Sequence, residues 1–133
     1  MKNFTVKSQK SVNGVNFGET RQAVRKVFGD EFREVKKSPV SPNTMDAYKE
    51  CHIFYTADNH LEAIEIFPEN TIIIDNKQFS TEYDIAKVWI KDNDPSAIEA
   101  DDGITSQRLG LNIYAPNGKI ESILFATREY FDF

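Results

Sequence analysis

The sequence predicts one α+β domain in which helices lie on one face of a mostly antiparallel sheet. Three observations predict it: a hairpin signal near the end of the chain, a similar pattern in its middle, and two stretches with apolar residues at helical spacing. The 133 residues suffice for one core, because a chain of this size buries roughly 65–70 % of the surface that its unfolded form exposes. Helices and hairpins in alternation are typical of this fold class.

The strongest local signal is the segment 109–126, in which two apolar runs flank Asn117-Gly118. Both residues of an Asn-Gly pair tolerate the positive φ angles of a tight turn, so this segment predicts a β-hairpin. A second hairpin is predicted at 51–67, where the runs C-H-I-F-Y and L-E-A-I-E-I-F flank a short polar turn.

The first helix is predicted between Thr20, a candidate N-cap, and Gly29, a candidate C-terminal residue. Its apolar side chains recur at helical spacing and predict one face that packs on the sheet: Ala23, Val24, Val27 and Phe28. Its polar side chains are expected on the opposite, solvent-exposed face: Arg21, Gln22, Arg25 and Lys26.

The second helix is predicted to begin near Thr81, because Thr81 and Asp84 have the spacing of a capping box. Its buried apolar face is expected to comprise Ile85, Val88 and Trp89.

The two predicted helices align at an offset of 61 residues, and the two hairpins align at an offset of 59. We therefore predict two similar halves, approximately residues 12–67 and 73–126. A repeat of this length indicates half-domains that share a core rather than an array of short repeats.

Charge is distributed unevenly along the chain. The net charge of −5 combines +4 in residues 1–57, −9 in residues 58–102 and no net charge in residues 103–133. The field of an acidic segment repels nucleic acid and attracts cationic partners. The same segment is also typical of a solvated surface that keeps a protein soluble, and both interpretations stay open.

No motif in the sequence predicts an enzyme or a cofactor. The patterns G-x-x-x-x-G-K-[ST], G-x-G-x-x-G and G-x-S-x-G are absent. Cys51 and His52 are adjacent, so in a strand their side chains face opposite sides and form no nucleophile–base pair. Cys51 is instead expected to be a small buried hydrophobe.

No metal site is predicted either. His52 and His60 lie on the first hairpin but lack a third ligand. Asp92, Asp94 and Ser96 match the first three ligand positions of an EF-hand, but the Gly and Glu that later positions require are missing.

The expected compartment is the cytoplasm, and a bacterial source is expected. No run approaches the roughly 18 apolar residues of a membrane span, and the sequence before Lys7 has no apolar signal region. One cysteine excludes an internal disulfide framework.

The segment Asn16–Gly29, N-F-G-E-T-R-Q-A-V-R-K-V-F-G, resembles the opening of domains related to β-lactamase inhibitor protein and to small outer-membrane assembly lipoproteins. Lys77–Ile90 is similar but lacks the terminal glycine. The resemblance implies a helical segment before a hairpin-built sheet, in tandem, that serves as a non-enzymatic protein-binding scaffold. The paired disulfides of the secreted inhibitor are absent, so its extracellular role is not transferred.

These observations favour a protein-binding module. Small acidic proteins without catalytic residues are similar to bacterial immunity proteins, many of which neutralise cationic toxin nucleases. The expected partner is a basic protein, without nucleic acid or membrane, and an acidic surface would provide the contact charges: Asp92, Asp94, Glu99, Asp101 and Asp102. The aromatic tail, with Tyr130, Phe131 and Phe133, either packs on the core or offers an exposed aromatic patch.

The competing hypothesis is a small-molecule-binding domain or a minor enzyme. Its pocket would lie between the sheet and the helices, with His52, Tyr55 or Tyr114 at the mouth.

Overall fold

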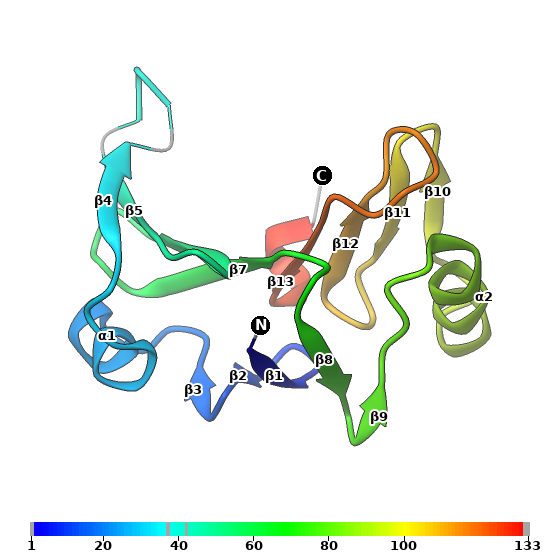
Figure 1. Cartoon of the computed structure of the whole chain (residues 1–133), viewed down its shortest axis with the longest axis horizontal. Helices are drawn as coiled ribbons and strands as arrows, with labels where there is room; N and C mark the ends of the chain where they lie inside the picture. The colour runs from blue at the N-terminus through cyan, green and yellow to red at the C-terminus, as the bar shows by residue number, and fades with distance from the viewer. Residues whose placement is uncertain (1, 37, 42, 132–133) are drawn as a thin grey trace.

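The structure, a computed structural model, describes residues 2–36, 38–41 and 43–131 and has an α+β fold with two sheets (Figure 1). The large antiparallel sheet has the strand order β10-β11-β12-β13-β7-β6-β5-β4. Its strands are β4 (Arg33–Lys36), β5 (Thr44–Ala47), β6 (Cys51–Tyr55), β7 (Leu61–Ile66), β10 (Ile98–Ala100), β11 (Gly103–Ser106), β12 (Leu111–Tyr114) and β13 (Ser122–Ala126).

The small sheet has the order β3-β2-β1-β8-β9, and its β1 and β8 are parallel. Its strands are β1 (Asn3–Lys7), β2 (Ser11–Val12), β3 (Val15–Asn16), β8 (Thr71–Ile74) and β9 (Lys77–Gln78). The helices are α1 (Arg21–Phe28), α2 (Tyr83–Asn93) and the short 3-10 helix η1 (Arg128–Phe131).

The core lies between the two sheets. Figure 1 shows the large sheet arching over the small one, with α1 near one end of the arch and α2 near the other. Phe4 and Ile72 of the small sheet belong to the same buried cluster as Ile64 and Phe125 of the large sheet. Burial of these side chains joins the two sheets into one unit.

Both predicted hairpins are confirmed. In β12–β13, Ile113 pairs with Ile123, and in β6–β7, Ile53 pairs with Ile64. The two hairpins meet at the centre of the large sheet, where β13 pairs with β7. Each helix is followed along the chain by four antiparallel strands, β4–β7 after α1 and β10–β13 after α2. The equivalence of the two halves, and the placement of both helices on one face, stay predictions.

Helix α1 has the predicted ends, and its predicted faces are right only in part. Val24 is buried and Phe28 packs on the core as predicted, whereas Val27 is 54 % exposed. The Thr20 side chain accepts a hydrogen bond from the Ala23 amide at 3.2 Å, and Gly29 ends the helix at a positive φ. The side chains of Arg21 and Arg25 were expected in solvent but are only 13 % and 29 % exposed. The reason is a buried carboxylate on β5, described below, that draws both guanidinium groups inward.

Helix α2 has its N-cap one residue later than predicted and buries a different face. Its N-cap is Glu82, without a side-chain capping bond. Ala86 and Ile90 are the buried residues, whereas Ile85 and Val88 are 54 % and 59 % exposed, so the predicted apolar face is wrong for these two. The third predicted residue of that face, Trp89, is half-buried with its ring edge-to-face against Phe79. The helix is therefore rotated relative to the prediction, about its own axis.

The aromatic tail packs on the protein as far as it is described. Phe131 in η1 is 3 % exposed and contacts Ala63 and Ala126 of the large sheet. Tyr130 packs on the same cluster, and Phe133 lies outside the described residues. In the described part of the chain, no helix has the length and apolar character to cross a membrane.

Candidate functional site

The acidic residues predicted as contact charges surround the β10–β11 hairpin and the end of α2. Ala100 pairs with Gly103, so Asp101 and Asp102 form the two-residue turn between the strands. Gly103 has φ +155°, and a Cβ there would lie 1.8 Å from the Ile113 carbonyl oxygen. Only glycine lets β11 approach β12 this closely. Gly103 directly follows Asp101 and Asp102, whose carboxylates lie at the tip of the hairpin.

Glu99 of β10 joins the hairpin to α2. Its carboxylate accepts hydrogen bonds from the ammonium groups of Lys87 at 2.9 Å and Lys91 at 2.5 Å. The Lys91 and Lys87 bonds lower the pKa of Glu99, and the Glu99 bond raises the pKa of Lys87. The pKa of Tyr83 is raised, first by burial and also by the charges of Glu99 and Asp102, which therefore act near the start of α2.

Asp94 does not belong to this surface, which corrects the prediction for that residue. It is 4 % exposed, and its carboxylate accepts hydrogen bonds from the Ser106 hydroxyl at 2.7 Å and the Ser96 amide at 3.0 Å. A carboxylate that follows a helix and bonds a nearby backbone amide is a local structural device. We define the acidic edge as the exposed residues that remain: Asp92, Glu99, Asp101 and Asp102.

Exposed apolar side chains lie on the same elements as the acidic edge. Ile85 and Val88 are three residues apart on α2 and therefore share one face of the helix. Ile98 of β10 is 68 % exposed. The exposure of Ile85 and Val88 had a signal in the sequence, because α2 carries apolar residues on two faces. The face with Ala86 and Ile90 is the buried one.

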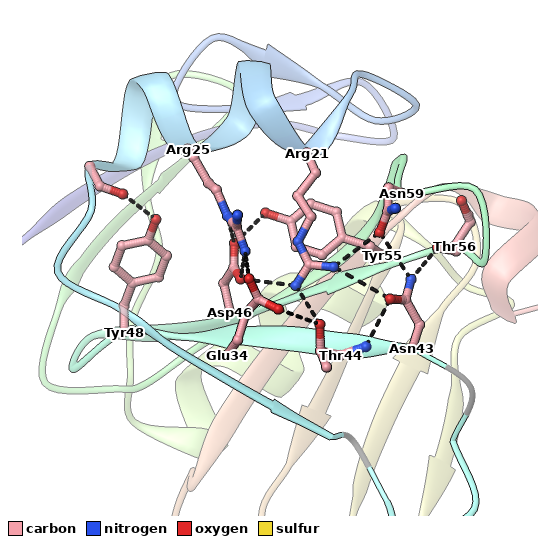
Figure 2. Close-up of polar contacts among 11 residues, drawn as sticks. Arg21, Arg25, Glu34, Asn43, Thr44, Asp46, Tyr48, Tyr55, Thr56 and Asn59 are labelled. Carbon is pink, nitrogen blue, oxygen red and sulfur yellow. Dashed lines mark hydrogen bonds and ion pairs between the residues drawn. The ribbon is translucent and has the colours of Figure 1, made fainter.

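A buried polar cluster between α1 and the large sheet was missed at the sequence level (Figure 2). At its centre the carboxylate of Asp46 on β5 is fully buried. It accepts hydrogen bonds from Arg25 Nε and Nη2 at 2.9 and 2.7 Å, from Arg21 Nη2 at 3.0 Å and from the Tyr55 hydroxyl at 2.8 Å. We call these four residues the Asp46 cluster.

The Asp46 cluster is extended by side chains on its exposed side. Glu34 of β4 accepts a second bond from Arg25 at 2.7 Å, and Asn59 accepts one from Arg21 at 3.0 Å. The Arg21 guanidinium also lies over the Tyr55 ring, 4.3 Å from its centroid. In Figure 2 both arginines point from α1 toward the sheet, so the cluster attaches the helix to β5 and β6.

The electrostatics of the Asp46 cluster leave no free acid or base. Burial acts to raise the pKa of Asp46, but bonds from Arg25, Arg21 and Tyr55 together hold it below its usual value. Burial and the Asp46 bond raise the pKa of Tyr55. A carboxylate held ionised by four donors and a tyrosine held protonated are typical of a structural ion cluster rather than of general acid–base catalysis.

We expect the protein to lose stability in acid through this cluster. The folded pKa of Asp46 lies below that of an unfolded Asp, so stability from the cluster is present above about pH 4 and falls as the pH drops toward the folded pKa. Urea unfolding measured across this range should show a steep loss in wild type and a shallower one in Asp46→Asn. Equal slopes would contradict the assignment.

The residues of the competing small-molecule hypothesis are not brought together. Tyr55 is buried in the Asp46 cluster. His52, three positions earlier in the strand, faces the opposite side, where it contacts Glu65 at 3.4 Å and the edge of the Phe67 ring. Tyr114 is 44 % exposed on β12, which β13 and β7 separate from β6.

The remaining sequence candidates are also separate. His52 of β6 pairs in register with Glu65, near the end of β7. His60 precedes the first residue of β7 and forms a β-bridge with Thr20. Among the described residues no three His, Cys, Asp or Glu side chains are close enough to hold a metal ion. Cys51 is buried as predicted, and burial raises the pKa of its thiol to about 12.

Comparisons with known proteins found no relative. No protein-family model, no curated protein and no solved structure matches the chain.

Proposed function

We propose that this protein is a non-enzymatic protein-binding module whose acidic edge binds a basic protein. The observation that carries the proposal is that exposed carboxylates and exposed apolar side chains occur together on α2 and the hairpin that follows it: Asp92, Asp101 and Asp102 with Ile85 and Val88. Interfaces combine an apolar centre with a polar rim, and charge complementarity selects the partner.

Charge gives the class of partner. Residues 80–102 carry seven Asp and Glu against two Lys, and both of those lysines are bound to Glu99. The field at this edge is therefore negative and attracts a cationic surface while it repels nucleic acid.

The most specific form of the proposal is a bacterial immunity or inhibitor protein that acts in the cytoplasm and neutralises a cationic toxin, such as a nuclease, by occlusion. The resemblance of Asn16–Gly29 to domains related to β-lactamase inhibitor protein supports a binding scaffold. The order of one helix followed by four antiparallel strands, found twice, supports an origin by duplication and packing of both helices on one face.

The test is affinity capture from lysate of the source organism, with wild-type protein as bait and washes at low and then high salt. We expect recovery of one basic protein that is released as salt rises, because screening weakens contacts between exposed charges. The captured protein is then purified, and its toxicity is measured with and without this chain.

A matched pair of baits makes the capture specific. The test bait carries Asp92→Lys, Asp101→Lys and Asp102→Lys. The control bait carries the same change of charge on exposed acids elsewhere, at Glu31, Asp58 and Glu69. Loss of the basic protein from the test bait alone supports the proposal. Equal capture by both variants, or no capture by wild type at either salt, contradicts it.

A further inference from the structure

A second surface, distinct from the acidic edge, has the opposite chemistry. A hollow of about 760 Å³ lies between the α2–β10 loop, the outer side of β10 and β11, the β11–β12 turn and η1. This volume is in the range of small-molecule sites, roughly 300–1,000 Å³. Arg108 and Arg128 line the hollow from the β11–β12 turn and from η1, and Ile98 and Phe131 supply apolar wall.

The two arginines of the hollow are exposed and, unlike the partly buried arginines of α1, have no carboxylate partner among the described residues. Within the described residues neither Arg108 nor Arg128 forms an ion pair, and the side-chain bond of Arg108 is to the Asn93 carbonyl oxygen at 3.4 Å. Arg21 and Arg25, in contrast, both bind Asp46.

The nearby carboxylates that the structure describes do not neutralise the hollow. Asp94 also lines it, but its oxygens accept bonds from Ser106 and Ser96, so it offsets at most one of the two positive charges. Glu129 lines a different hollow, and its pKa is lowered first by its own backbone amide, then by Thr127 and by the charge of Arg128. Among residues 2–36, 38–41 and 43–131, two guanidinium groups against one buried carboxylate make a positive site for a negatively charged ligand.

The backbone that carries both arginines is fixed by one side chain. The Gln9 amide nitrogen donates to the carbonyl oxygens of Gln107 and Arg108 at 3.1 and 2.7 Å, and its oxygen accepts from the Arg128 amide at 3.2 Å. Gln107 adds a bond to the Phe131 carbonyl oxygen at 2.7 Å. The β11–β12 turn and η1 are thereby held together, so the backbone from which both arginines extend is fixed at one hollow.

A close backbone contact tightens the same junction. Gly110 has φ +66°, and a Cβ there would lie 2.3 Å from the Ala126 carbonyl oxygen and 3.0 Å from Gln9 Cγ. The turn therefore approaches the end of β13 more closely than a side chain would allow.

We propose that this hollow is a binding site for a small organic oxyanion, a carboxylate or phosphate on an apolar body. Arg108 and Arg128 bind the oxyanion, Ser96 and Thr105 offer hydroxyl groups to it, and Ile98 and Phe131 contact the apolar part. Arginine suits this role because its planar guanidinium matches both carboxylate and phosphate oxygens.

The test is an NMR titration of the ¹⁵N-labelled full chain with three probes of similar size: phenyl phosphate, phenylacetate and benzyl alcohol. We expect the two anions, but not the neutral alcohol, to shift the amide signals of residues 107–110 and 127–131. The ratio of phosphate to carboxylate affinity then distinguishes the two headgroups.

Variants assign the effect to the arginines. We expect Arg108→Gln and Arg128→Gln each to weaken anion binding about tenfold, the size of one lost charge-assisted hydrogen bond. Arg33→Gln, at an exposed arginine of β4, should leave affinity unchanged. The proposal is overturned if no anion shifts these amides, if benzyl alcohol binds equally well, or if the double Arg variant, with its wild-type spectrum otherwise kept, binds as before.

Discussion

Replacing Asp46 by Ala is expected to lower the free energy of unfolding by about 3–5 kcal/mol, the usual result of removing one partner of a buried ion pair. The change leaves Arg21 and Arg25 without their shared carboxylate and the Tyr55 hydroxyl without its acceptor. Both arginines retain some contact with solvent, so the lower end of that range is expected. Urea unfolding at neutral pH measures the effect.

Two further variants separate charge from burial in the Asp46 cluster. Glu34→Ala removes a carboxylate that also binds Arg25 but is 50 % exposed, and it should cost about 1 kcal/mol or less. Asp46→Asn keeps the shape of the side chain and one acceptor oxygen but removes the charge, so its effect should lie between the two. If Asp46→Ala were no more destabilising than Glu34→Ala, the cluster would not be what holds α1 to the sheet.

The Asp46 cluster also explains why the faces of α1 could not be predicted from the sequence. Helical spacing correctly placed Val24 on the buried side and Thr20 and Gly29 at the ends. Helical periodicity assigns arginine to the exposed face of a helix. The pattern contains no information about a carboxylate 21 positions later in the chain. Arg25 faces inward because, together with Arg21, it binds the buried carboxylate of Asp46. Val27, which periodicity placed on the buried face, is 54 % exposed.

The hairpins, in contrast, could be predicted because their signals lie within short segments of the sequence. The β12–β13 turn depends on the residues in it, because the Gly118 amide donates to the Ala115 carbonyl oxygen at 3.2 Å and Gly118 takes the positive φ of +77° that favours glycine. Asn117, in contrast, does not adopt the positive φ that the sequence pattern predicted. The pairing of β7 with β13 joins the two hairpins into one large sheet. It depends on two segments about 60 residues apart, so no local sequence pattern predicts it. Gln9 acts across a still longer separation, so the hollow that it organises could not be predicted from the sequence.

A count of charges along the sequence locates an acidic segment but does not show which of its side chains are exposed. It drew attention to α2 and β10, but it gave Asp92 and Asp94 the same role. The structure separates them, because the helix ends between them and directs Asp94 toward Ser106. Asp92 stays in solvent. This difference provides a sharp control for the proposed interface.

Reversing Asp92, Asp101 and Asp102 to lysine is expected to weaken binding to the purified basic partner about a hundredfold at low salt. Each reversal removes an attraction and adds a like-charge contact, and such changes act on both association rate and affinity. The loss should shrink as salt rises, because the Debye length falls from about 10 Å at 0.1 M to about 3 Å at 1 M. Calorimetry at two salt concentrations measures both effects.

Asp94→Asn is the matched control for that prediction. It removes a neighbouring carboxylate of the same segment, so a simple effect of net charge on the segment would appear here too. Because Asp94 is buried against Ser106, we expect a lower free energy of unfolding and affinity within about twofold of wild type, as for a residue outside a contact surface. If Asp94→Asn weakened binding as much as Asp92→Lys alone, or if the triple reversal left affinity unchanged at low salt, the acidic edge would not be the interface.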